Sequence, residues 1–351
     1  MKILVTGGAG FVGSALVRYL IRETDSYVVN VDSLTYAANL AALEGTDDNP
    51  RYAFEHHDIT SGPHLADIFL RHRPDAVIHL AAESHVDRSI DGPRPFIDTN
   101  IVGTYMLLET SYRYYAELDC KIKKNFRFLH VSTDEVYGSL GKTGTFGEES
   151  PYKPSSPYAA SKASADHLVS AWNKTYGLPT VISTSTNNYG PWQFPEKLIP
   201  TVIVKALDGL PVPLYGDGRN IRDWIYVEDH ASALWRILNV GNIGERYNIG
   251  SRTELSNLDI SKTICAHLDK LSPRSDGLPH EQNIVFVSDR PGHDFRYALK
   301  TDKLASELDW MPLCDLDSGI ARTVSWYIDK EDWWRSVLNG SYDGRRQGLD
   351  R

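Results

Sequence analysis

Short apolar runs that alternate with longer amphipathic stretches restrict the folds open to this chain more than any other feature. The apolar runs are predicted to be buried strands, at residues 2–6, 27–31, 76–80, 126–131 and 179–183. The amphipathic stretches are predicted to be helices, at residues 11–23, 65–71, 95–117 and 157–176. Because parallel strands need crossover helices, the pattern predicts an α/β fold with a doubly wound parallel sheet.

A glycine-rich turn follows the first predicted strand and opens the first predicted helix. Gly7, Gly10 and Gly13 would allow a tight turn, the close approach of a pyrophosphate, and close packing of the helix on the strand. Asp32 lies 19 residues after Gly13, at the end of the second strand. There its carboxylate can accept hydrogen bonds from the hydroxyls of an adenine ribose and would repel a 2′-phosphate, so NAD is the expected cofactor.

The chain of 351 residues is too long for most single-core domains. Beyond about Gly190 the pattern changes to loops rich in Pro, Gly and Trp, with short strands at 224–227 and 284–287 and helices at 259–271 and 317–329. We therefore expect a Rossmann domain over residues 1–187, with a strand-helix return near 223–242. A smaller α+β substrate-binding domain is expected mainly over residues 188–351.

Composition excludes several classes of protein. The net charge of -9 argues against a nucleic-acid surface. The N-terminus has no features of a signal peptide and no run is typical of a membrane span, so a cytoplasmic location is expected. Cys120, Cys265 and Cys314 lack the spacing of a metal site, and no metal is expected.

Tyr158 and Lys162 are four residues apart in a predicted helix, which places the phenol and the ammonium on one face. A lysine cation stabilises a phenolate, so the tyrosine can take a proton from a sugar hydroxyl. Ser132 and Thr133 end the fifth strand, at the edge of the sheet where ligands bind. His79, on a buried strand, is expected to be a hydrogen-bonded core residue.

Taken in this order, these motifs resemble the extended short-chain dehydrogenase/reductase family, which acts on nucleotide sugars, over nearly the whole chain. Within that family, the run STDEVYG at residues 132–138 is similar to the 4,6-dehydratases of nucleoside-diphosphate-glucose, those acting on dTDP-glucose above all. Further stretches that carry the resemblance are residues 79–89, 187–191, 196–200, 222–224 and 289–294.

The resemblance implies a lyase that oxidises C4 of the sugar transiently, eliminates water across C5 and C6, and returns the hydride to C6. Elimination needs one group to protonate the departing C6 hydroxyl and another to remove the C5 proton. Two adjacent carboxyls whose pKa values differ can divide these tasks, and the resemblance assigns Asp134 as the acid and Glu135 as the base. Tyr158, assisted by Thr133 and Lys162, is expected to deprotonate the C4 hydroxyl.

Cofactor and substrate contacts are also implied by the resemblance. Asp58 and Ile59 could meet the adenine or form only a strand-end turn. The other NAD contacts are expected at Phe11, Val12, Ser33, Leu34, Thr35, Leu80, Ala81, Ala82, Ser84, Thr99 and Asn187. Arg222, Arg290 and Lys197 are expected to hold the substrate pyrophosphate. Further substrate contacts are expected at Ser84, His85, Thr133, Asn188, Glu196, Leu198, Pro213, Tyr215, Asn257, His293 and Tyr297.

Several alternatives stay open. Residues 184–186 read TST where relatives tend to carry Arg or Asn, Cys and Ser, which leaves open the required base of the nucleotide. A UDP-sugar 4-epimerase would share the fold and the Tyr158–Lys162 pair but has no use for Asp134 beside Glu135. A non-catalytic NAD-binding scaffold would have little reason to keep all four side chains. Relatives form a dimer through helices 95–117 and 157–176, so a homodimer is expected, although these apolar faces could equally be core.

Overall fold

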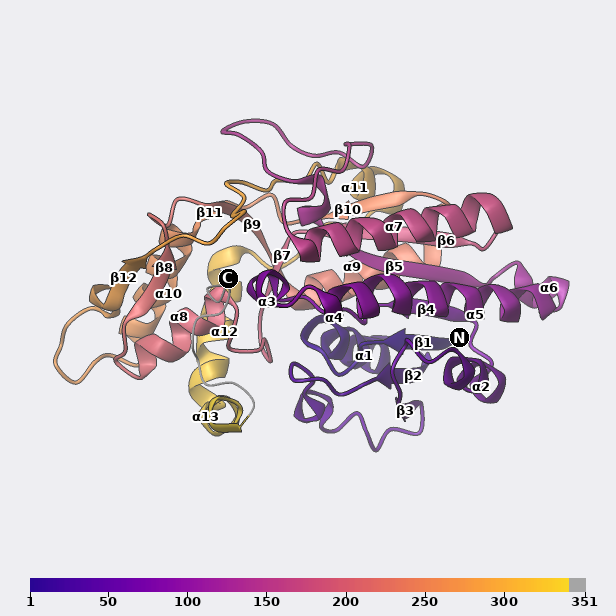
Figure 1. The fold of residues 1–351 in the computed structure, drawn as a ribbon. Helices are drawn as coiled ribbons and strands as arrows, with labels where there is room; N and C mark the ends of the chain where they lie inside the picture. Colours follow the sequence, from indigo (N-terminus) through magenta and orange to yellow (C-terminus); the bar gives the residue numbers. More distant parts are fainter. Residues whose placement is uncertain (341–351) are drawn as a thin grey trace.

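The computed structural model describes residues 1–340, and a seven-stranded parallel sheet forms the larger part of the fold (Figure 1). Its strands are β1 (Lys2–Thr6), β2 (Tyr27–Asp32), β3 (Tyr52–His56), β4 (Ala76–His79), β5 (Arg127–Thr133), β6 (Thr180–Ser185) and β10 (Arg246–Ile249). They lie in the order β10-β6-β5-β4-β1-β2-β3, and every neighbouring pair is parallel. This is the Rossmann order, in which the chain changes direction between β1 and β4, the point where ligands of such sheets bind.

Helices cover both faces of the large sheet. The helices α1 (Phe11–Glu23) and α9 (Val227–Val240) pack on one face, whereas α2 (Gly62–His72), α5 (Thr104–Glu117) and α7 (Pro157–Tyr176) pack on the other. Ile3 and Val5 belong to the core beneath α1 and α9, and Leu4 between them belongs to the opposite core. Because successive residues of a strand face opposite sides, a strand covered on both faces is apolar throughout. The predicted doubly wound α/β sheet is confirmed.

A smaller α+β lobe lies beside the large sheet, on the left of Figure 1. It contains the sheet β11-β9-β7, made of β7 (Asn187–Tyr189), β9 (Ile221–Tyr226) and β11 (Glu254–Ser256), and the parallel pair β8 (Val212–Tyr215) and β12 (Ile284–Val287). Its main helices are α8 (Leu198–Leu207), α10 (Asn257–Leu271), α12 (Leu316–Asp329) and α13 (Glu331–Gly340). Tyr189, Ile260, Tyr327 and Trp334 are fully or almost fully buried in its separate core. The short elements are η1 (Leu40–Leu43), α3 (Val86–Asp91), α4 (Arg94–Phe96), α6 (Cys120–Lys123), η3 (Asp134–Tyr137), η4 (His280–Asn283) and α11 (Asp302–Leu308).

One long predicted helix is interrupted. The helices predicted at 11–23 and 157–176 have the bounds of α1 and α7, but the stretch 95–117 contains α4, a π-helical turn η2 (Ile97–Gly103) and then α5. The wider turn brings the Asn100 side chain to the backbone of Glu83, with hydrogen bonds of 2.8 and 3.0 Å. A π turn allows a local tertiary contact of this kind. The spacing of apolar residues in the sequence does not reveal such a turn.

The strand-helix return near 223–242 is only partly as expected. Helix α9 packs on the large sheet, but β9 pairs with β7 and β11, and it is β10 that joins the large sheet beside β6. Asp223 explains the position of β9, because its buried carboxylate accepts hydrogen bonds from the backbone of Ser251, Arg252 and Thr253. The domain boundary near residue 187 stays a prediction, and residues 341–351 lie outside the described part. Within residues 1–340, no helix has both the length and the apolar character that crossing a bilayer requires.

Candidate active site

The glycine-rich turn joins β1 to α1, and close contacts within it require glycine. Gly7 has a φ of 73°, in the left-handed region, and a Cβ there would lie 2.6 Å from the backbone nitrogen of Ala81. A Cβ on Gly13 would overlap the carbonyl oxygen of Gly7. No side chain caps the first turn of α1, so its N–H groups are available to a pyrophosphate.

Asp32, at the end of β2, is hydrogen-bonded both to this turn and to the loop that follows β2. Its Oδ2 accepts a hydrogen bond from the N–H of Ala9 at 2.9 Å, and its Oδ1 accepts one from the N–H of Leu34 at 2.8 Å. Burial raises the pKa of Asp32, and these two N–H groups oppose that rise. Each carboxylate oxygen keeps acceptor capacity, so the fixed carboxylate fits the diol of an adenine ribose.

The other residues predicted to bind NAD follow the ends of neighbouring strands or lie on adjacent helices. Asp58 accepts hydrogen bonds from both the N–H and the hydroxyl of Thr60, which makes it part of a strand-end turn. Asn187, on β7, has a buried Oδ1 with no partner in the protein, so this atom can receive a ligand donor. The rest are Phe11 and Val12 on α1, Ser33, Leu34 and Thr35 after β2, buried Ile59 after β3, Leu80, Ala81, Ala82 and Ser84 after β4, and Thr99 in η2.

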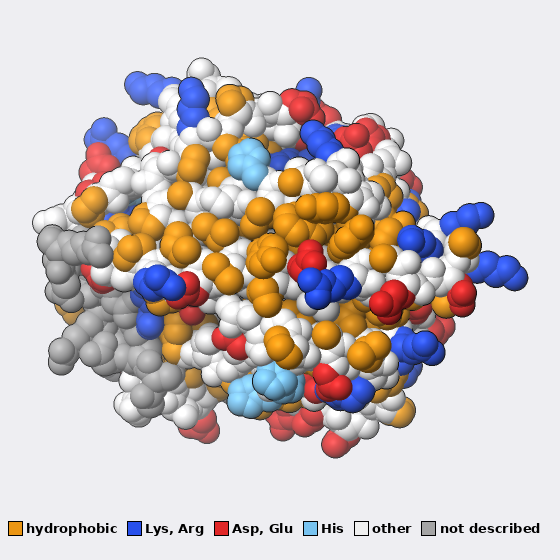
Figure 2. Space-filling view, turned by 45° about the vertical axis from the view of Figure 1, so that its right-hand side comes forward, with side chains coloured by type: hydrophobic (Ala, Val, Ile, Leu, Met, Phe, Trp, Pro, Cys, Tyr) orange, Lys and Arg blue, Asp and Glu red, His pale blue; other side chains and the backbone are white. Residues whose placement is uncertain are grey.

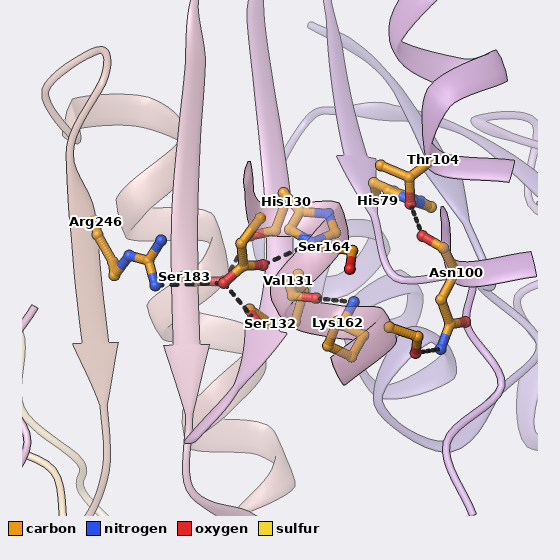
Figure 3. Close-up of polar contacts among 12 residues, drawn as sticks. His79, Asn100, Thr104, His130, Val131, Ser132, Lys162, Ser164, Ser183 and Arg246 are labelled. Atoms are coloured by element: carbon orange, nitrogen blue, oxygen red, sulfur yellow. Dashed lines mark hydrogen bonds and ion pairs between the residues drawn. The ribbon is translucent and has the colours of Figure 1, made fainter. Parts of the chain in front are cut away.

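Tyr158 and Lys162 lie in the first turns of α7, facing the end of β5. Ser156 caps this helix by accepting a hydrogen bond from the N–H of Ala159 at 3.1 Å. Both side chains are buried, and the Lys162 ammonium donates a hydrogen bond to the carbonyl oxygen of Val131 at 2.8 Å (Figure 3). The four-residue spacing therefore does place the phenol and the ammonium on one buried face.

Thr133, Asp134 and Glu135 are carried to Tyr158 by the end of β5 and the turn η3 that follows directly. Burial raises the pKa of Tyr158, the charge of Glu135 raises it further, and a hydrogen bond with Thr133 lowers it. Helix α7 packs directly on β5 and η3, so the residues predicted to be catalytic lie together. Since burial disfavours the phenolate, Tyr158 needs a nearby positive charge to act as a base near neutral pH.

The two adjacent carboxyls have different surroundings. Burial raises the pKa of Asp134 well above its ordinary value, and the charge of Glu135 raises it further. Burial also raises the pKa of Glu135, but Arg290, Arg222 and Lys197 all oppose this rise. Asp134 is therefore the carboxyl that holds a proton more tightly, and its Oδ2 is buried without a hydrogen-bond partner.

The two arginines predicted to bind a pyrophosphate lie close to Glu135, but each is already partly engaged. Arg222, on β9, donates to the carbonyl oxygens of Ile221 at 2.7 Å and Asp294 at 2.9 Å. Arg290 donates to Asp87 at 2.7 Å, whereas its Nε is buried with no partner. Arg290 therefore keeps a donor for an anionic ligand.

Aromatic and polar side chains of the smaller lobe surround these arginines. The guanidinium of Arg222 lies 4.3 Å from the ring centre of Tyr297, and the Tyr297 hydroxyl donates to Asp294. Tyr215, on β8 beside Pro213, has its ring 5.9 Å from the ring of His293. Burial lowers the pKa of His293 to about 4, so this ring is neutral near pH 7. The side chain of Asn257, at the start of α10, has a buried Oδ1 without a partner.

The segment before α8 meets the loop after β4. Lys197 donates from its ammonium to the carbonyl oxygen of Ser84 at 2.9 Å. The carboxylate of Glu196 is buried, 3.8 Å from the His85 ring, and Leu198 begins α8. Burial lowers the pKa of His85 to about 3, so it too is neutral. These residues join the smaller lobe to the large sheet.

Asn188 differs from the other predicted substrate contacts. Its side-chain nitrogen donates to the carbonyl oxygen of Thr186 at 3.0 Å, and its Oδ1 lies 2.7 Å from Nδ1 of His230. Both ends of the amide are thus engaged within the protein, which favours a structural role for this side chain in the β7 region.

Three charged or phenolic residues of this region are absent from the predicted site. Asp87, on α3, accepts hydrogen bonds from Arg290 and from the Tyr215 hydroxyl, both at 2.7 Å. Tyr36 donates to Glu196 at 3.2 Å, and the guanidinium of Arg88 lies 3.5 Å from the Tyr36 ring centre. The stretch 79–89 contains two of them, but no spacing in the sequence relates them to residues more than 100 positions away.

Comparison with known proteins places the chain in a family. The model of the GDP-mannose 4,6 dehydratase family matches residues 4–323. The dTDP-glucose 4,6-dehydratase of Neisseria meningitidis serogroup B is 56% identical over 353 residues, covering 100% of this chain and 99% of the relative. The solved structure of dTDP-glucose 4,6-dehydratase from Streptomyces venezuelae, with NAD bound, is 43% identical with a TM-score of 0.87, covering 96% of this chain and 100% of that one.

A second solved structure leads to the same family. The dTDP-glucose 4,6-dehydratase of Bacillus anthracis in complex with NAD has a TM-score of 0.85 and 42% identity, covering 96% of this chain and 99% of that chain. Similarity in sequence and in fold extends through both lobes. The chain therefore belongs to the dTDP-glucose 4,6-dehydratase family of extended short-chain dehydrogenases/reductases.

Proposed function

We propose that this chain is a lyase that converts dTDP-glucose to dTDP-4-keto-6-deoxyglucose, with NAD as its cofactor. The observation that carries the proposal is the proximity of Tyr158 to Asp134 and Glu135, seen in the effect of both carboxyls on the pKa of the phenol. A base for a sugar hydroxyl and an acid-base pair for elimination thus meet at one edge of the sheet, as the predicted reaction requires.

The glycine turn and Asp32 fit NAD. The turn is so tight that a Cβ at Gly7 or Gly13 would overlap backbone atoms, and Asp32 is held where it can bind the ribose. When bound, NAD supplies the transient oxidation at C4 of the sugar and the reducing equivalent that returns to C6. The protein's part is to orient the sugar and to move protons.

Tyr158 takes the proton of the C4 hydroxyl. The Thr133 hydroxyl lowers the pKa of the phenol, and Lys162, one helical turn away, contributes positive charge. Asp134, whose pKa is the more strongly raised, then donates a proton to the leaving C6 hydroxyl. Burial also raises the pKa of Glu135, but three cations oppose that rise, so Glu135 is the carboxyl of the pair that ionises more readily and removes the C5 proton.

Substrate recognition falls to the smaller lobe. Arg222, Arg290 and Lys197 provide positive charge for the pyrophosphate, and the unpartnered oxygen of Asn257 is available to a ligand donor. Glu196, Leu198, His293 and Tyr297 line the same region, and Pro213 and Tyr215 flank the base. Ser84 and His85 face the sugar.

Turnover of dTDP-, UDP-, CDP- and GDP-glucose tests the proposal. The product is measured by the absorbance that 4-keto-6-deoxy sugars develop in alkali, and we expect preference for dTDP-glucose. A preference for another nucleotide would correct the substrate alone. A 4-epimer without a keto sugar would favour an epimerase, and no change in any substrate would favour a non-catalytic scaffold.

The functional unit is proposed to be a homodimer in which a second copy covers α5 and α7. These helices lie side by side on the outer face of the sheet (Figure 1), and Figure 2 shows apolar side chains in a band across this face of the molecule. Val102 and Tyr105 are each 42% exposed here, and Tyr105 also packs on Trp172 of α7. An exposed apolar band on a pair of helices supports an isologous contact between copies.

Val102→Asp tests this assembly, because a carboxylate in an apolar contact is costly to bury. We expect the variant to elute as a monomer in size-exclusion chromatography with light scattering. Leu313→Asp is the matched control, since Leu313 is 92% exposed on the other lobe, and it should keep the mass of the wild type. A wild-type monomer would contradict the proposal.

The cytoplasmic location likewise stays a proposal, and cell fractionation tests it.

A further inference from the structure

A buried carboxylate that the proposed reaction does not use lies one helical turn beyond the catalytic lysine. Asp166 is on α7, four residues after Lys162 and eight after Tyr158, and its side chain has 0% exposure. A carboxyl with no access to water is costly to bury and persists only when its surroundings compensate.

The hydrogen bonds to Asp166 converge on one oxygen of its carboxyl. Its Oδ2 accepts hydrogen bonds from the hydroxyls of Ser132 at 2.9 Å and Tyr152 at 2.6 Å, and from the guanidinium of Arg246 at 3.3 Å. Its Oδ1 lies 3.2 Å from Nε2 of His130. Three donors on Oδ2, one of them always cationic, require that this oxygen carry no proton. Burial raises the pKa of Asp166 to about 7, and the charge of Lys162 opposes that rise, so the two buried groups favour each other's charged form.

The groups around Asp166 link the large sheet to α7. Ser132 and His130 are on β5, and Arg246 is on β10, two strands further. Figure 3 shows Arg246 on one side of Ser132 and Lys162 on the other. The guanidinium of Arg246 also lies 4.7 Å from the ring centre of Tyr152. Asp166 thus lies between two cations, of which only Lys162 belongs to the catalytic group.

The two buried histidines beside Lys162 carry no charge. His79 Nδ1 lies 2.8 Å from the Thr6 hydroxyl, and His79 Nε2 lies 2.9 Å from the Thr104 hydroxyl, which itself donates to a carbonyl oxygen. The ring is therefore a neutral Nε2–H tautomer, which confirms His79 as a hydrogen-bonded core residue. Burial lowers the pKa of both His79 and His130 well below the ordinary value. The titratable groups that face Lys162 or Asp166 are His79 on β4, His130 on β5, Tyr137 on η3, Tyr152 in the loop before α7, Tyr158 and His167 on α7, and Arg246 on β10.

We propose that Asp166 is a positioning residue of the active site, which keeps the buried Lys162 ammonium charged and, through Ser132, holds the end of β5 against α7. The proposal deepens the proposed function and rests on it, since it concerns how Lys162 assists Tyr158. Burial lowers the pKa of Lys162 and Asp166 opposes that change. A lysine that lost its proton could no longer stabilise the Tyr158 phenolate.

Asp166→Asn removes this charge while keeping the shape of the side chain. We expect the Lys162 ammonium of the NAD-bound enzyme to lose its proton about 1–2 pH units lower than in the wild type. The titration is followed by NMR of lysines labelled with ¹³C at Cε, with the Lys162 signal assigned from its loss in Lys162→Met. The alkaline limb of the kcat–pH profile should move to lower pH by a similar amount, with KM for the nucleotide sugar unchanged.

Two further variants make the test specific. Asp166→Glu keeps a carboxylate and should return the Lys162 titration toward that of the wild type. Arg246→Gln removes the second cation beside Asp166, so the Lys162 titration in this variant should move to higher pH. This variant provides a test if Asp166→Asn does not fold. Asp67→Asn is the matched control, because it removes an exposed carboxylate paired with Arg71 four residues away, and it should change neither measurement.

The outcomes separate this inference from the proposed function. An unchanged Lys162 titration in Asp166→Asn overturns the inference, even if kcat and thermal stability fall, because the role would then be structural. Wild-type kcat with an unshifted pH profile also overturns it. If the wild-type enzyme turns over no nucleotide sugar, the proposed function fails, while the NMR titration still decides whether Asp166 sets the charge of Lys162.

Discussion

Replacing Asp134 by asparagine separates the elimination step from the rest of the proposed reaction. Burial, followed by the charge of Glu135, raises the pKa of Asp134 well above its ordinary value, so this carboxyl keeps its proton to a higher pH than an ordinary aspartate. Asparagine has nearly the same shape and is also neutral, but it cannot deliver a proton to a leaving hydroxyl. General acid catalysis contributes about 10²–10⁴-fold, so kcat should fall by that factor, which corresponds to about 3–5 kcal/mol in the barrier.

The stability of Asp134→Asn should not fall with its activity. In the folded protein one neutral group replaces another of the same size, so the free energy of unfolding should change by less than about 1 kcal/mol at a pH low enough to protonate Asp134 in both the folded and the unfolded state. A carboxyl whose folded-state pKa lies above its unfolded value contributes stability at low pH, and that contribution is lost as the pH rises through the raised pKa. Asp134→Asn should therefore become more stable relative to the wild type as pH increases from about 4 upward.

The assay combines product formation with the absorbance of reduced cofactor. Because Tyr158, Thr133 and Lys162 are intact, C4 is still oxidised, and the absorbance band of NADH should rise when dTDP-glucose is added and then persist. Denaturant unfolding at several pH values measures stability, with Asp67→Asn, an exposed carboxylate, as the control. A kcat within tenfold of the wild type would refute Asp134 as the acid, and the absence of the NADH band would refute the separation of the two steps.

Two further changes test the cofactor site. Gly13→Ala places a Cβ onto the Gly7 carbonyl oxygen, so it should lower the free energy of unfolding by about 1–3 kcal/mol and abolish NAD binding. Gly147→Ala, where a Cβ meets nothing within 4 Å, should leave both unchanged, and equal effects of the two substitutions would contradict the reasoning. Asp32→Ala removes the acceptor of two backbone N–H groups as well as that of the ribose, so the Kd for NAD should rise about 10–100-fold in calorimetry. Wild-type NAD affinity in this variant would remove Asp32 from the cofactor site.

The sequence revealed the features whose cause is local. The turn at Gly7 to Gly13 was visible because Gly10 and Gly13 lie against the carbonyl oxygen of Gly7, only a few residues away. The strands of the large sheet were visible because their burial on both faces leaves continuous apolar runs. The Tyr158–Lys162 pair was visible because helical spacing alone puts both side chains on one face.

Features that depend on distant partners were not visible. Nothing near β9 shows that Asp223 will accept hydrogen bonds from residues 251–253, so the pairing of β9 with β7 and β11 could not be predicted from the sequence. The engagement of Asp87 with Arg290 joins residues 203 positions apart. Asp166 is intermediate, since its spacing from Lys162 could be read from the sequence, whereas its three hydrogen-bond donors come from two strands and a loop.

The position of Arg222 and Arg290 has a consequence for the timing of proton removal. These cations hold down the proton affinity of Glu135 while no anion is present. A pyrophosphate that bound them would neutralise much of their field, and the carboxylate would then become more basic at the moment when a sugar lies beside it. Glu135 would thus be a weaker base in the free enzyme and a stronger base when the nucleotide sugar is bound.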